Sequence, residues 1–351
     1  MLQNQPAPVS VIVPARNEAE NIARLVRSLA AQDGVREILV VDDQSEDRTF
    51  EILQSLRAEA PQLRVLRIES LPEGWLGKNY AVSVAAAEAE GDWLLFTDAD
   101  TEHLPGSLAA VLGRAEREGA DLLSLSPGQR TPTWWEKAVI PLVYVNLARL
   151  YRFEEVSDPA SPAAAANGQY LLIRRALYER VGGHRAIRDQ LLEDVELAKR
   201  AKQAGGKLLF LPGAAWVQTR MYRTFSEMWR GWTKNLYLIY GGSLTKILRT
   251  VAELCTLDLL PQIGFIAALL WLLSGRGNVF VLGLALGCML VLWVRQAAYL
   301  RAVKRLGFDS RVAPWWLVGV VMLGALLVNS VIAHRVSHRV EWKGRRYSTG
   351  G

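Results

Sequence analysis

The 351-residue sequence is poor in cysteine and lacks an obvious export signal. Its two cysteines, Cys255 and Cys288, lie in or beside apolar segments and fit neither a disulfide framework nor a metal site. The first residues lack a basic segment followed by an apolar one, so no signal peptide is visible. We therefore expect the amino-terminal part of the chain to stay in the cytoplasm.

Strand and helix patterns alternate through the first part of the chain. Segments rich in apolar residues at 9–14, 37–41, 63–68 and 93–96 predict strands. A helical pattern follows the first run, with Asn17 as its expected N-cap and an end near Gln32. Alternating strands and helices joined by short loops predict an α/β fold with a parallel, doubly wound sheet.

Acidic side chains follow two of the predicted strands. Asp42 and Asp43 follow the second, and Asp98 and Asp100 follow the run at 93–96. Ligands of open α/β sheets bind beyond the carboxyl ends of the strands. Two carboxylates two residues apart suit Mg²⁺ or Mn²⁺ holding a diphosphate. A solvated turn is the alternative explanation of the second pair, and helix capping is the alternative explanation of the first.

Three further positions suggest a binding site. Lys78 follows a glycine-rich loop, where its ammonium group could balance a diphosphate. Gly168 precedes a predicted strand and would allow a ligand to approach the backbone closely. Glu193 and Asp194 begin a helix, a place where acidic residues are also common without any function.

Four segments in this order resemble the inverting family 2 glycosyltransferases, with a match over roughly residues 9–235. They are residues 10–18, 40–49, 74–78 and 97–100. Within the family, the chain is most similar to membrane-bound enzymes of the carotenoid, hopanoid-associated and ceramide glucosyltransferase-like branches. The resemblance implies a GT-A fold, which is Rossmann-like, with a mostly parallel sheet and flanking helices. It also implies a nucleotide-sugar donor, which we expect to be a UDP-sugar, and Mg²⁺ or Mn²⁺ as cofactor.

The resemblance also implies roles for individual residues. Inverting transfer is a single in-line displacement, so it needs a base on the acceptor side, and the family's Glu-Asp motif makes this Asp194, with Glu193 beside it. The donor site would comprise Pro14, Arg16, Glu18, Asp43, Lys78, Asp98, Asp100 and Gly168. The metal would be held by Asp100, Asp98 and Glu102.

Candidates for contact with the diphosphate or the acceptor, besides Glu193, are Arg220, Arg223, Arg230 and Trp232. Processive and lipid-acting members of the family often carry a Gln/Arg-x-x-Arg-Trp motif in this region. Here the sequence is Trp229-Arg230-Gly231-Trp232, without an arginine directly before the second tryptophan. This departure argues against a polymer-forming enzyme.

The last hundred residues are dominated by apolar segments. We predict a catalytic domain at 1–240, a membrane region at 251–334 and a basic tail at 335–351. The membrane region holds apolar segments at about 254–274, 278–298 and 313–333, near the length that spans a bilayer. Helices at about 134–152 and 223–240 carry aromatic and basic residues that suit either a membrane surface or packing on the protein's own core.

The number of membrane crossings stays open at this point. Basic residues lie both between the second and third apolar segments and after the third. The positive-inside rule favours the cytoplasm for both, which three full crossings from a cytoplasmic start do not allow. Either one segment is re-entrant or the tail lies outside. The stretch at 340–347 resembles the closing segment of the lipid-glycosylating relatives, which favours a cytoplasmic tail.

The sequence thus predicts a glycosyltransferase on the inner face of the cell membrane. It would move a sugar with inversion to a hydroxyl or carboxylate of a membrane lipid. A nucleotide-sugar-binding membrane protein without turnover is one alternative. A nucleotidyltransferase with a similar sheet is another, although the loop at 14–18 has no glycine for a phosphate. We expect no nucleic-acid partner, because the basic residues concentrate beside the apolar segments.

Overall fold

The computed structural model describes residues 8–337, 339–342 and 345–348, which form two compact units. Unit 1 contains the described residues up to Arg130 together with Tyr151–Met221. Unit 2 contains Thr131–Leu150 and the described residues from Tyr222 onward. The division does not follow chain order, because one helix from the middle of the chain belongs with the carboxyl-terminal helices.

Unit 1 is built on a seven-stranded sheet with the order β3-β2-β1-β4-β8-β6-β9. The pairs β3–β2, β2–β1, β1–β4 and β6–β9 are parallel, whereas β8 runs antiparallel to both of its neighbours. The predicted α/β class with a mostly parallel sheet is therefore confirmed. The strands are β1 (Val9–Ala15), β2 (Val35–Asp43), β3 (Leu63–Ile68), β4 (Trp93–Phe96), β6 (Leu122–Ser126), β8 (Leu171–Arg174) and β9 (Leu208–Pro212).

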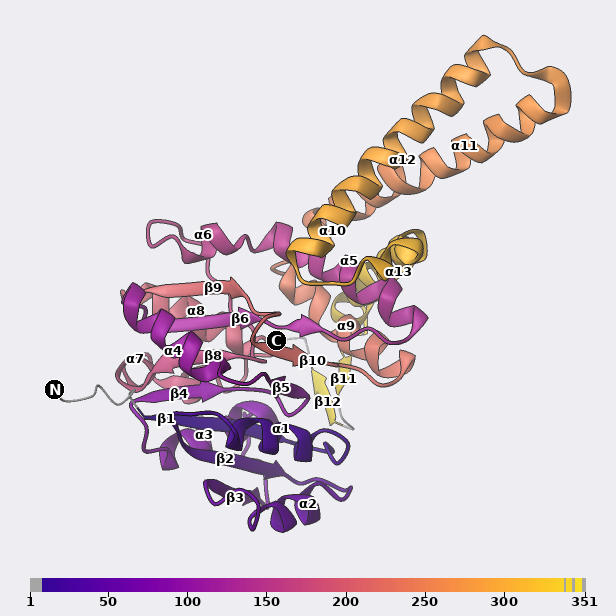
Figure 1. The fold of residues 1–351 in the computed structure, drawn as a ribbon. Helices are drawn as coiled ribbons and strands as arrows, with labels where there is room; N and C mark the ends of the chain where they lie inside the picture. The colour runs from indigo at the N-terminus through magenta and orange to yellow at the C-terminus, as the bar shows by residue number, and fades with distance from the viewer. Residues whose placement is uncertain (1–7, 338, 343–344, 349–351) are drawn as a thin grey trace. The chain divides into compact units, whose positions relative to one another are not determined.

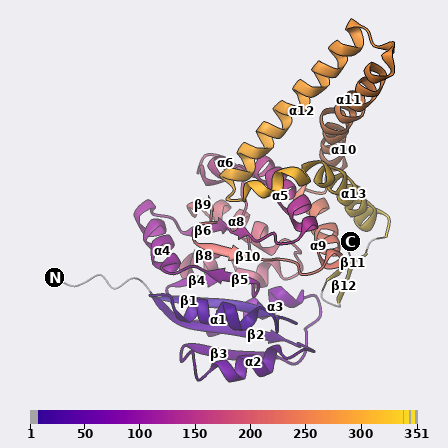
Figure 2. The same cartoon turned by 45° about the vertical axis from the view of Figure 1, so that its right-hand side comes forward.

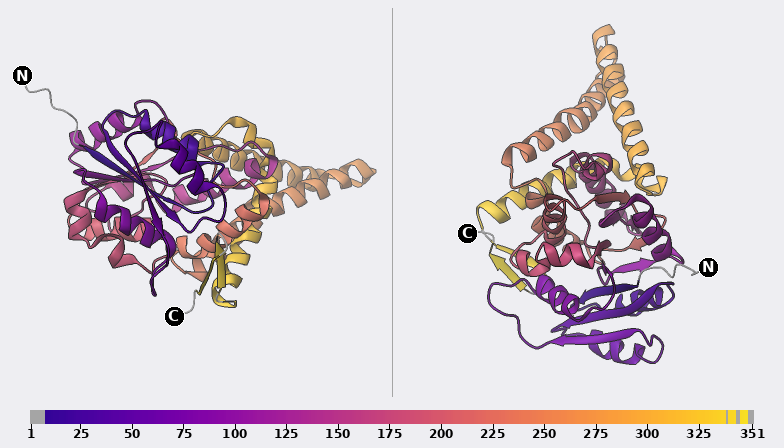
Figure 3. Two further views of the ribbon diagram at one scale, coloured as in Figure 1. Left: turned by 90° about the horizontal axis from the view of Figure 1, so that it is seen from below. Right: turned by 90° about the vertical axis from the view of Figure 1, so that its left-hand side faces the viewer.

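Helices cover both faces of this sheet (Figures 1 and 3). The side chains of β1 alternate between two apolar cores, with Val11 and Val13 in one and Ile12 in the other. Such burial on both faces explains the continuous apolar runs in the sequence. One core is closed by α1 (Ile22–Ala30), α2 (Thr49–Leu56) and α4 (Ser107–Glu118). The other is closed by α3 (Gly77–Glu88), α6 (Phe153–Ser157), α7 (Arg175–Arg180), the 3₁₀ turn η1 (Gly183–Ile187) and α8 (Glu193–Gln203).

A second, three-stranded sheet lies beyond the end of β4. Its strands are β5 (Thr101–His103), β10 (Val217–Thr219) and β7 (Gly128–Gln129), in that order. Strand β10 is antiparallel to β5 and parallel to β7. Because β5 follows Asp100 directly, this small sheet fixes the far end of the acidic turn.

The first helix begins later than the sequence suggested. Helix α1 starts at Ile22, and Asn17 is not its N-cap. Asn17 has a left-handed backbone, with a φ of 53°, and its side-chain oxygen accepts a hydrogen bond from the backbone N–H of Glu46 at 2.8 Å. Its side chain therefore holds the loop after β2 instead of the start of α1.

Unit 2 consists almost entirely of helices. Those from the middle of the chain are α5 (Trp134–Leu150) and α9 (Phe225–Ile239). They are followed by α10 (Leu244–Glu253), the π-helical turn η2 (Leu254–Leu259), α11 (Leu260–Trp271) and the π-helical turn η3 (Leu272–Arg276). The chain continues with α12 (Val279–Arg305), the 3₁₀ turn η4 (Ser310–Trp315) and α13 (Trp316–Arg335). A hairpin of β11 (Arg339–Trp342) and β12 (Arg345–Ser348) ends the described chain.

Three continuous helical stretches in unit 2 are long and apolar enough to cross a membrane: Leu244–Arg276, Val279–Arg305 and Ser310–Arg335. The first two form a hairpin in which α11 runs back along α12 (Figure 2). Within the predicted basic tail, Lys343, Gly344 and residues 338 and 349–351 lie outside the described residues, as do the first seven residues of the chain.

Candidate active site

The carboxyl ends of β1, β2 and β4 meet at one edge of the large sheet. Pro14 and Ala15 of β1 lie opposite Val41 and Asp42 of β2, and β4 pairs with β1 on the other side. The acidic exits of β2 and β4 therefore flank the end of β1, as expected for parallel strands.

Arg16 ties the loops after β1 and β2 together. Its Nη1 donates hydrogen bonds to the backbone carbonyl oxygens of Asp43, at 2.9 Å, and Gln44, at 3.0 Å. Its Nη2 lies 3.3 Å from Oε1 of Glu46. The Asp43 side chain is buried between these loops. Arg16 thus shapes the place where Asp43 would meet a ligand.

Glu18 strengthens the same connection from the other side. Its backbone N–H donates to the hydroxyl of Thr49 at 2.8 Å, and its carboxylate accepts from the amide of Asn21 at 2.8 Å. The predicted donor residues Arg16, Glu18 and Asp43 therefore belong to one hydrogen-bonded loop pair.

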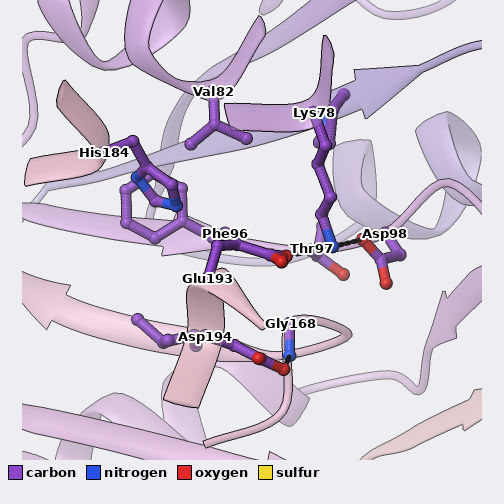
Figure 4. Close-up of a pocket in the computed structure, with 11 residues that line it drawn as sticks. Lys78, Val82, Phe96, Thr97, Asp98, Gly168, His184, Glu193 and Asp194 are labelled. Carbon is purple, nitrogen blue, oxygen red and sulfur yellow. Dashed lines mark hydrogen bonds and ion pairs between the residues drawn. The ribbon is translucent and has the colours of Figure 1, made fainter. Parts of the chain in front are cut away.

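Lys78 joins the exit of β4 to the start of α8. Its Nζ lies 2.7 Å from Oδ1 of Asp98 and 2.7 Å from Oε1 of Glu193 (Figure 4). Burial lowers the pKa of Lys78, but the charges of Asp98, Glu193 and Asp194 outweigh it and raise the pKa well above its ordinary value. The ammonium group is thus permanently charged and bridges two carboxylates.

Asp194 lies in the first turn of α8 and is held by two backbone N–H groups. Gly168 donates to its Oδ2 and Val195 to its Oδ1, both at 2.8 Å. Burial, with the neighbouring charge of Glu193, raises the pKa of Asp194 to about 7, although Lys78 and the two N–H groups oppose the shift. Near neutral pH this carboxylate can therefore both accept and release a proton.

Gly168 leaves little room for a side chain. A Cβ added there would lie 3.0 Å from Nζ of Lys78 and 3.3 Å from Oε1 of Glu193. Contacts this short would displace the end of the lysine. The backbone at this glycine therefore lies close to charged side chains of the site, while the predicted approach of a ligand stays a prediction.

These residues line one small pocket in unit 1. Its walls are formed by Pro14, Lys78, Val82, Phe96, Thr97, Asp98, Gly168, Leu171, His184, Glu193 and Asp194. The pocket includes six residues named from the sequence as donor-site, base or contact candidates. The apolar wall could not be predicted from the sequence, because Val82, Phe96 and Leu171 have the pattern of ordinary core positions.

His184 belongs to the floor of the pocket. Its Nδ1 lies 3.0 Å from the hydroxyl of Tyr178, and its ring meets that of Phe96 edge-on, with the centroids 5.0 Å apart. Burial lowers its pKa to about 3, and the charge of Lys78 acts in the same direction. The imidazole is thus neutral and packs as part of the core.

A buried polar cluster beneath the acidic turn was also missed. The hydroxyl of Thr97 donates to the carbonyl of Gln169 at 2.8 Å and lies 2.9 Å from the hydroxyl of Thr101 and 3.1 Å from Nε2 of His103. These bonds fix the backbone from which Asp98 extends. Polar residues inside an otherwise apolar strand end are the only trace of this cluster in the sequence.

The acidic turn provides hard oxygen ligands for a cation. The ammonium of Lys78 already occupies one carboxylate oxygen of Asp98, so a positive charge is stabilised at this position. Asp98 and Asp100 therefore suit Mg²⁺ or Mn²⁺. Across the part of the chain that the structure describes, no three His, Cys, Asp or Glu side chains cluster as metal ligands. A metal here would need oxygens from its ligand, as Mg²⁺ commonly does with phosphates.

Glu102 lies on β5 in an ion-pair network. Its Oε2 is 2.8 Å from Nη2 of Arg130 and 3.4 Å from Nε of Arg24. Both ion pairs use Oε2, so the two arginines compete with a metal for this oxygen of the carboxylate.

The remaining candidates lie elsewhere. Arg220 follows β10 in unit 1, whereas Arg223, Arg230 and Trp232 belong to unit 2. The ring of Trp232 is buried in unit 2, with its centroid 6.2 Å from that of Tyr222 and 6.3 Å from that of Tyr144. None of the four lines the pocket of unit 1.

Comparison with known proteins gives matches to glycosyltransferases. The family model described as "Glycosyl transferase family 2" matches residues 10–182. A 4,4'-diaponeurosporenoate glycosyltransferase of Staphylococcus haemolyticus (strain JCSC1435) is 28% identical over 241 residues, covering 68% of this chain and 63% of that protein. The enzyme of the same name from Staphylococcus aureus (strain MRSA252) is 25% identical over 357 residues, covering 97% of this chain and 88% of that protein.

A solved structure supports the fold. The mannosyltransferase PcManGT from Pyrobaculum calidifontis, determined in complex with GDP-Man and Mn²⁺, superposes with a TM-score of 0.55. The two chains are 18% identical, and the match covers 95% of this chain and 88% of the other. The architecture of unit 1 is therefore the GT-A fold that the sequence predicted.

Proposed function

The chain is a family 2 glycosyltransferase, and we propose that it transfers a sugar with inversion from a nucleotide-sugar donor to an apolar, membrane-resident acceptor. The observation that carries the proposal is the pocket of unit 1. It gathers Lys78, Asp98, Gly168 and Asp194 from four separate segments of the chain. Together these residues provide a cation, a metal-binding carboxylate and a carboxylate with a raised pKa.

The donor would bind at the ends of β1, β2 and β4. Asp43, in the loop pair shaped by Arg16, would accept hydrogen bonds from the nucleoside. Asp98 and Asp100 would hold a divalent metal, which when bound neutralises charge on the diphosphate leaving group. Lys78 would add a further positive charge there, since it already pairs with Asp98.

Asp194 would act as the base. In a direct displacement, the acceptor hydroxyl must lose its proton as its oxygen bonds to the anomeric carbon and the diphosphate leaves. A carboxylate with a pKa near 7 is well matched to this task at neutral pH. The two backbone N–H groups that hold it fix its orientation.

The acceptor class follows from the relatives and from unit 2. The relatives are named for transfer to 4,4'-diaponeurosporenoate, a carotenoid acid, and three apolar helices in this chain suit a membrane. We therefore propose a lipid-like acceptor bearing a hydroxyl or a carboxylate, met at the inner face of the cell membrane. A UDP-sugar is the donor that we would test first.

The test uses detergent-solubilised protein with Mn²⁺ or Mg²⁺ and a panel of UDP- and GDP-sugars. Each donor is paired with a carotenoid acid, a long-chain alcohol or a bacterial lipid extract, and both nucleoside diphosphate release and new glycolipid are measured. We expect metal-dependent product from one donor. Donor binding without product from any acceptor would contradict the proposal.

Asp194→Asn tests the base, with Asp189→Asn as a matched control because Asp189 is exposed. For a hydroxyl acceptor we expect a loss of about 10²- to 10⁴-fold with Asp194→Asn, the usual contribution of a general base. A carboxylate acceptor is already ionised at neutral pH, so there the loss should be much smaller. Full activity of Asp194→Asn on a hydroxyl acceptor would refute the assignment of the base.

A further inference from the structure

The three apolar stretches of unit 2 differ in how much protein covers them. Within the most apolar window of each stretch, 11% of Leu244–Arg276 and 6% of Val279–Arg305 is buried, against 39% of Ser310–Arg335. The first two therefore expose apolar side chains around nearly their whole circumference. The third, which contains α13, is partly enclosed by other helices.

Helices α5 and α9 are the ones that cover α13, and α5 cannot cross a membrane. Both ends of α5 continue directly into unit 1, at Arg130 and at Tyr151. A 17-residue helix that leaves a polar domain and returns to it has both ends on one side of the bilayer. Helix α5 must therefore lie on the side of the catalytic unit.

Helix α9 also belongs on that side. It follows unit 1 directly and carries Glu227, Arg230 and Lys234 at spacings of three and four residues, which place them on one face. Placing such charges in the hydrocarbon would cost roughly 2.5–3.5 kcal/mol for each basic residue. A helix with one charged face and one apolar face suits the membrane surface.

The amino-terminal part of α13 contacts α5. Gly319 lies so close to α5 that an added Cβ would collide with the carbonyl oxygen of Ala138. Just before α13, the ring of Trp315 lies 5.9 Å from that of Trp134, measured between centroids. The start of α13 is therefore at the level of the start of α5.

The carboxyl-terminal part of α13 is joined to α9 by hydrogen bonds. The hydroxyl of Ser330 donates to the carbonyl of Thr233 at 2.6 Å and accepts from the backbone N–H of Tyr237 at 2.8 Å. The amide of Asn329 donates to the hydroxyl of Thr233 at 2.8 Å. Nε of Arg335 donates to the hydroxyl of Tyr237, also at 2.8 Å. The end of α13 is thus held beside α9.

Both ends of α13 are consequently fixed to helices on the catalytic side. A 20-residue helix is about 30 Å long, so a crossing would put its ends on opposite faces of the bilayer. Contacts with α5 at one end and α9 at the other are incompatible with that arrangement. Figure 2 shows α13 beside α5, while α11 and α12 extend away from it.

The α11–α12 hairpin has the opposite character, with a polar base and an apolar stem. Arg295 binds Asp258 through two hydrogen bonds, of 2.7 and 2.8 Å, and its Nη1 lies 3.1 Å from Oε1 of Glu253. Glu253 also pairs with Arg149, at the end of α5, at 2.9 Å. Because α5 is on the catalytic side, this charged cluster marks where the hairpin leaves that side.

Beyond the cluster, residues 279–294 of α12 carry no charge. Sixteen helical residues span about 24 Å, close to the roughly 30 Å thickness of the hydrocarbon. Most large side chains along the stem are exposed, including Ile263, Leu270, Leu290 and Trp293. A bilayer is the environment that this exposed apolar surface fits.

We propose that the α11–α12 hairpin is the only part of the described chain that enters the hydrocarbon, and that α5, α9 and α13 form a platform on the membrane surface. Both chain segments that flank α13 then lie on the catalytic side. This places the basic residues before and after α13 on one side, as the positive-inside rule favours. The proposal relies on the membrane association in the proposed function but not on the transfer reaction.

The experiment measures which side of the membrane single cysteines face. In the full chain with both native cysteines replaced by alanine, one cysteine is introduced by Ser310→Cys, Ser337→Cys, Ser274→Cys or Ser55→Cys. These serines are exposed and lie before α13, after α13, at the hairpin tip and in unit 1, respectively. A membrane-impermeant maleimide is applied to inside-out vesicles and to spheroplasts of a bacterial expression host.

Ser55→Cys defines the catalytic side. We expect the maleimide to label Ser310→Cys and Ser337→Cys in the preparation in which it labels Ser55→Cys, and to label neither of them in the other preparation. Ser274→Cys should not label from the catalytic side. Labelling of positions 310 and 337 from opposite sides would overturn the proposal, because α13 would then cross. Labelling of position 274 from the catalytic side would overturn it as well, because the hairpin would then lie outside the bilayer.

The outcome is independent of whether the proposed transfer is right, because labelling needs neither donor nor acceptor. A chain that shows no transfer but labels as expected would leave the topology standing. If the protein transfers sugar but the maleimide labels positions 310 and 337 from opposite sides, the proposed function is supported and the proposed topology is wrong.

Discussion

Replacing Asp194 by asparagine should change the stability of the protein as well as its activity, and the change should depend on pH. The carboxylate is partly buried beside Glu193, and its pKa is raised from 3.8 to about 7. Between these two values the unfolded chain has released the proton while the folded protein retains it. The free energy of unfolding of the wild type therefore falls as pH rises through this window.

The structure sets the size of this effect. Each unit of pKa difference corresponds to about 1.4 kcal/mol, so the shift from 3.8 to about 7 amounts to about 4 kcal/mol. This is an upper limit, because the side chain is only partly buried. The whole penalty is present above pH 7, and none of it is present below pH 4. Asp194→Asn cannot ionise and escapes the penalty.

A second effect opposes the first but does not vary with pH. The two carboxylate oxygens of Asp194 accept one hydrogen bond each, from Gly168 and Val195. Asparagine has a single acceptor oxygen, so one N–H group loses its partner, at a cost of about 1–3 kcal/mol. The stability of the variant relative to the wild type should thus be lower at pH 5 than at pH 8.

Thermal unfolding in detergent, without donor or metal, measures this difference. The quantity of interest is the Tm of Asp194→Asn minus the Tm of the wild type, compared between pH 5 and pH 8. We expect it to increase by several degrees toward pH 8. Asp189→Asn, at an exposed position, should show no such increase. A difference in Tm that stays constant with pH would refute the raised pKa and with it the physical basis of the proposed base.

Three further predictions concern single side chains. Glu193→Gln removes a neighbouring negative charge from the proposed base, so the acid limb of the pH–activity profile should move to lower pH, provided that the acceptor is a hydroxyl. Gly168→Ala places a methyl group 3.0 Å from Nζ of Lys78 and should lower kcat/KM by about tenfold with little change in Tm. A fall in Tm that accompanies the loss of kcat/KM would indicate misfolding instead. Gly319→Leu should lower the Tm in detergent by several degrees because it forces α13 away from α5, whereas Gly324→Leu, which meets no neighbouring atom, should not.

The sequence alone determined the class of unit 1 and the chemistry of its strand ends. Short, mainly apolar runs separated by helical patterns favour a largely parallel sheet, because strands covered on both faces are mostly apolar. Once the strands were placed, the acidic residues after the second and fourth runs had to meet at one edge. Lys78, Asp98 and Asp194 were named from the sequence, and all three line the pocket of unit 1.

Local sequence was less reliable at loops. Asn17 precedes acidic residues and resembles a helix N-cap, but a tertiary hydrogen bond to the loop after β2 holds it in a left-handed conformation. Helix α1 therefore begins at Ile22, four residues after the start that an N-cap at Asn17 would give. Capping preferences act within a few residues, and a partner 29 positions away overrode them here.

The electrostatic state of the site was decided only by the tertiary structure. Lys78 and Glu193 are far apart in sequence, yet their charged atoms lie 2.7 Å apart. The raised pKa of Asp194 depends on burial and on its neighbouring charges, neither of which spacing along the chain reveals. Burial acts in the opposite direction on the pKa of His184, which it lowers to about 3, so this side chain is a neutral core residue.

The organisation of unit 2 also required the fold. Hydropathy treats the three apolar stretches alike, because it counts residues and not neighbours. Only the folded chain shows that α13 packs on α5 and α9 while α11 and α12 expose their side chains. Composition thus determined that this region is apolar, and tertiary packing decided which apolar surface is left for a membrane.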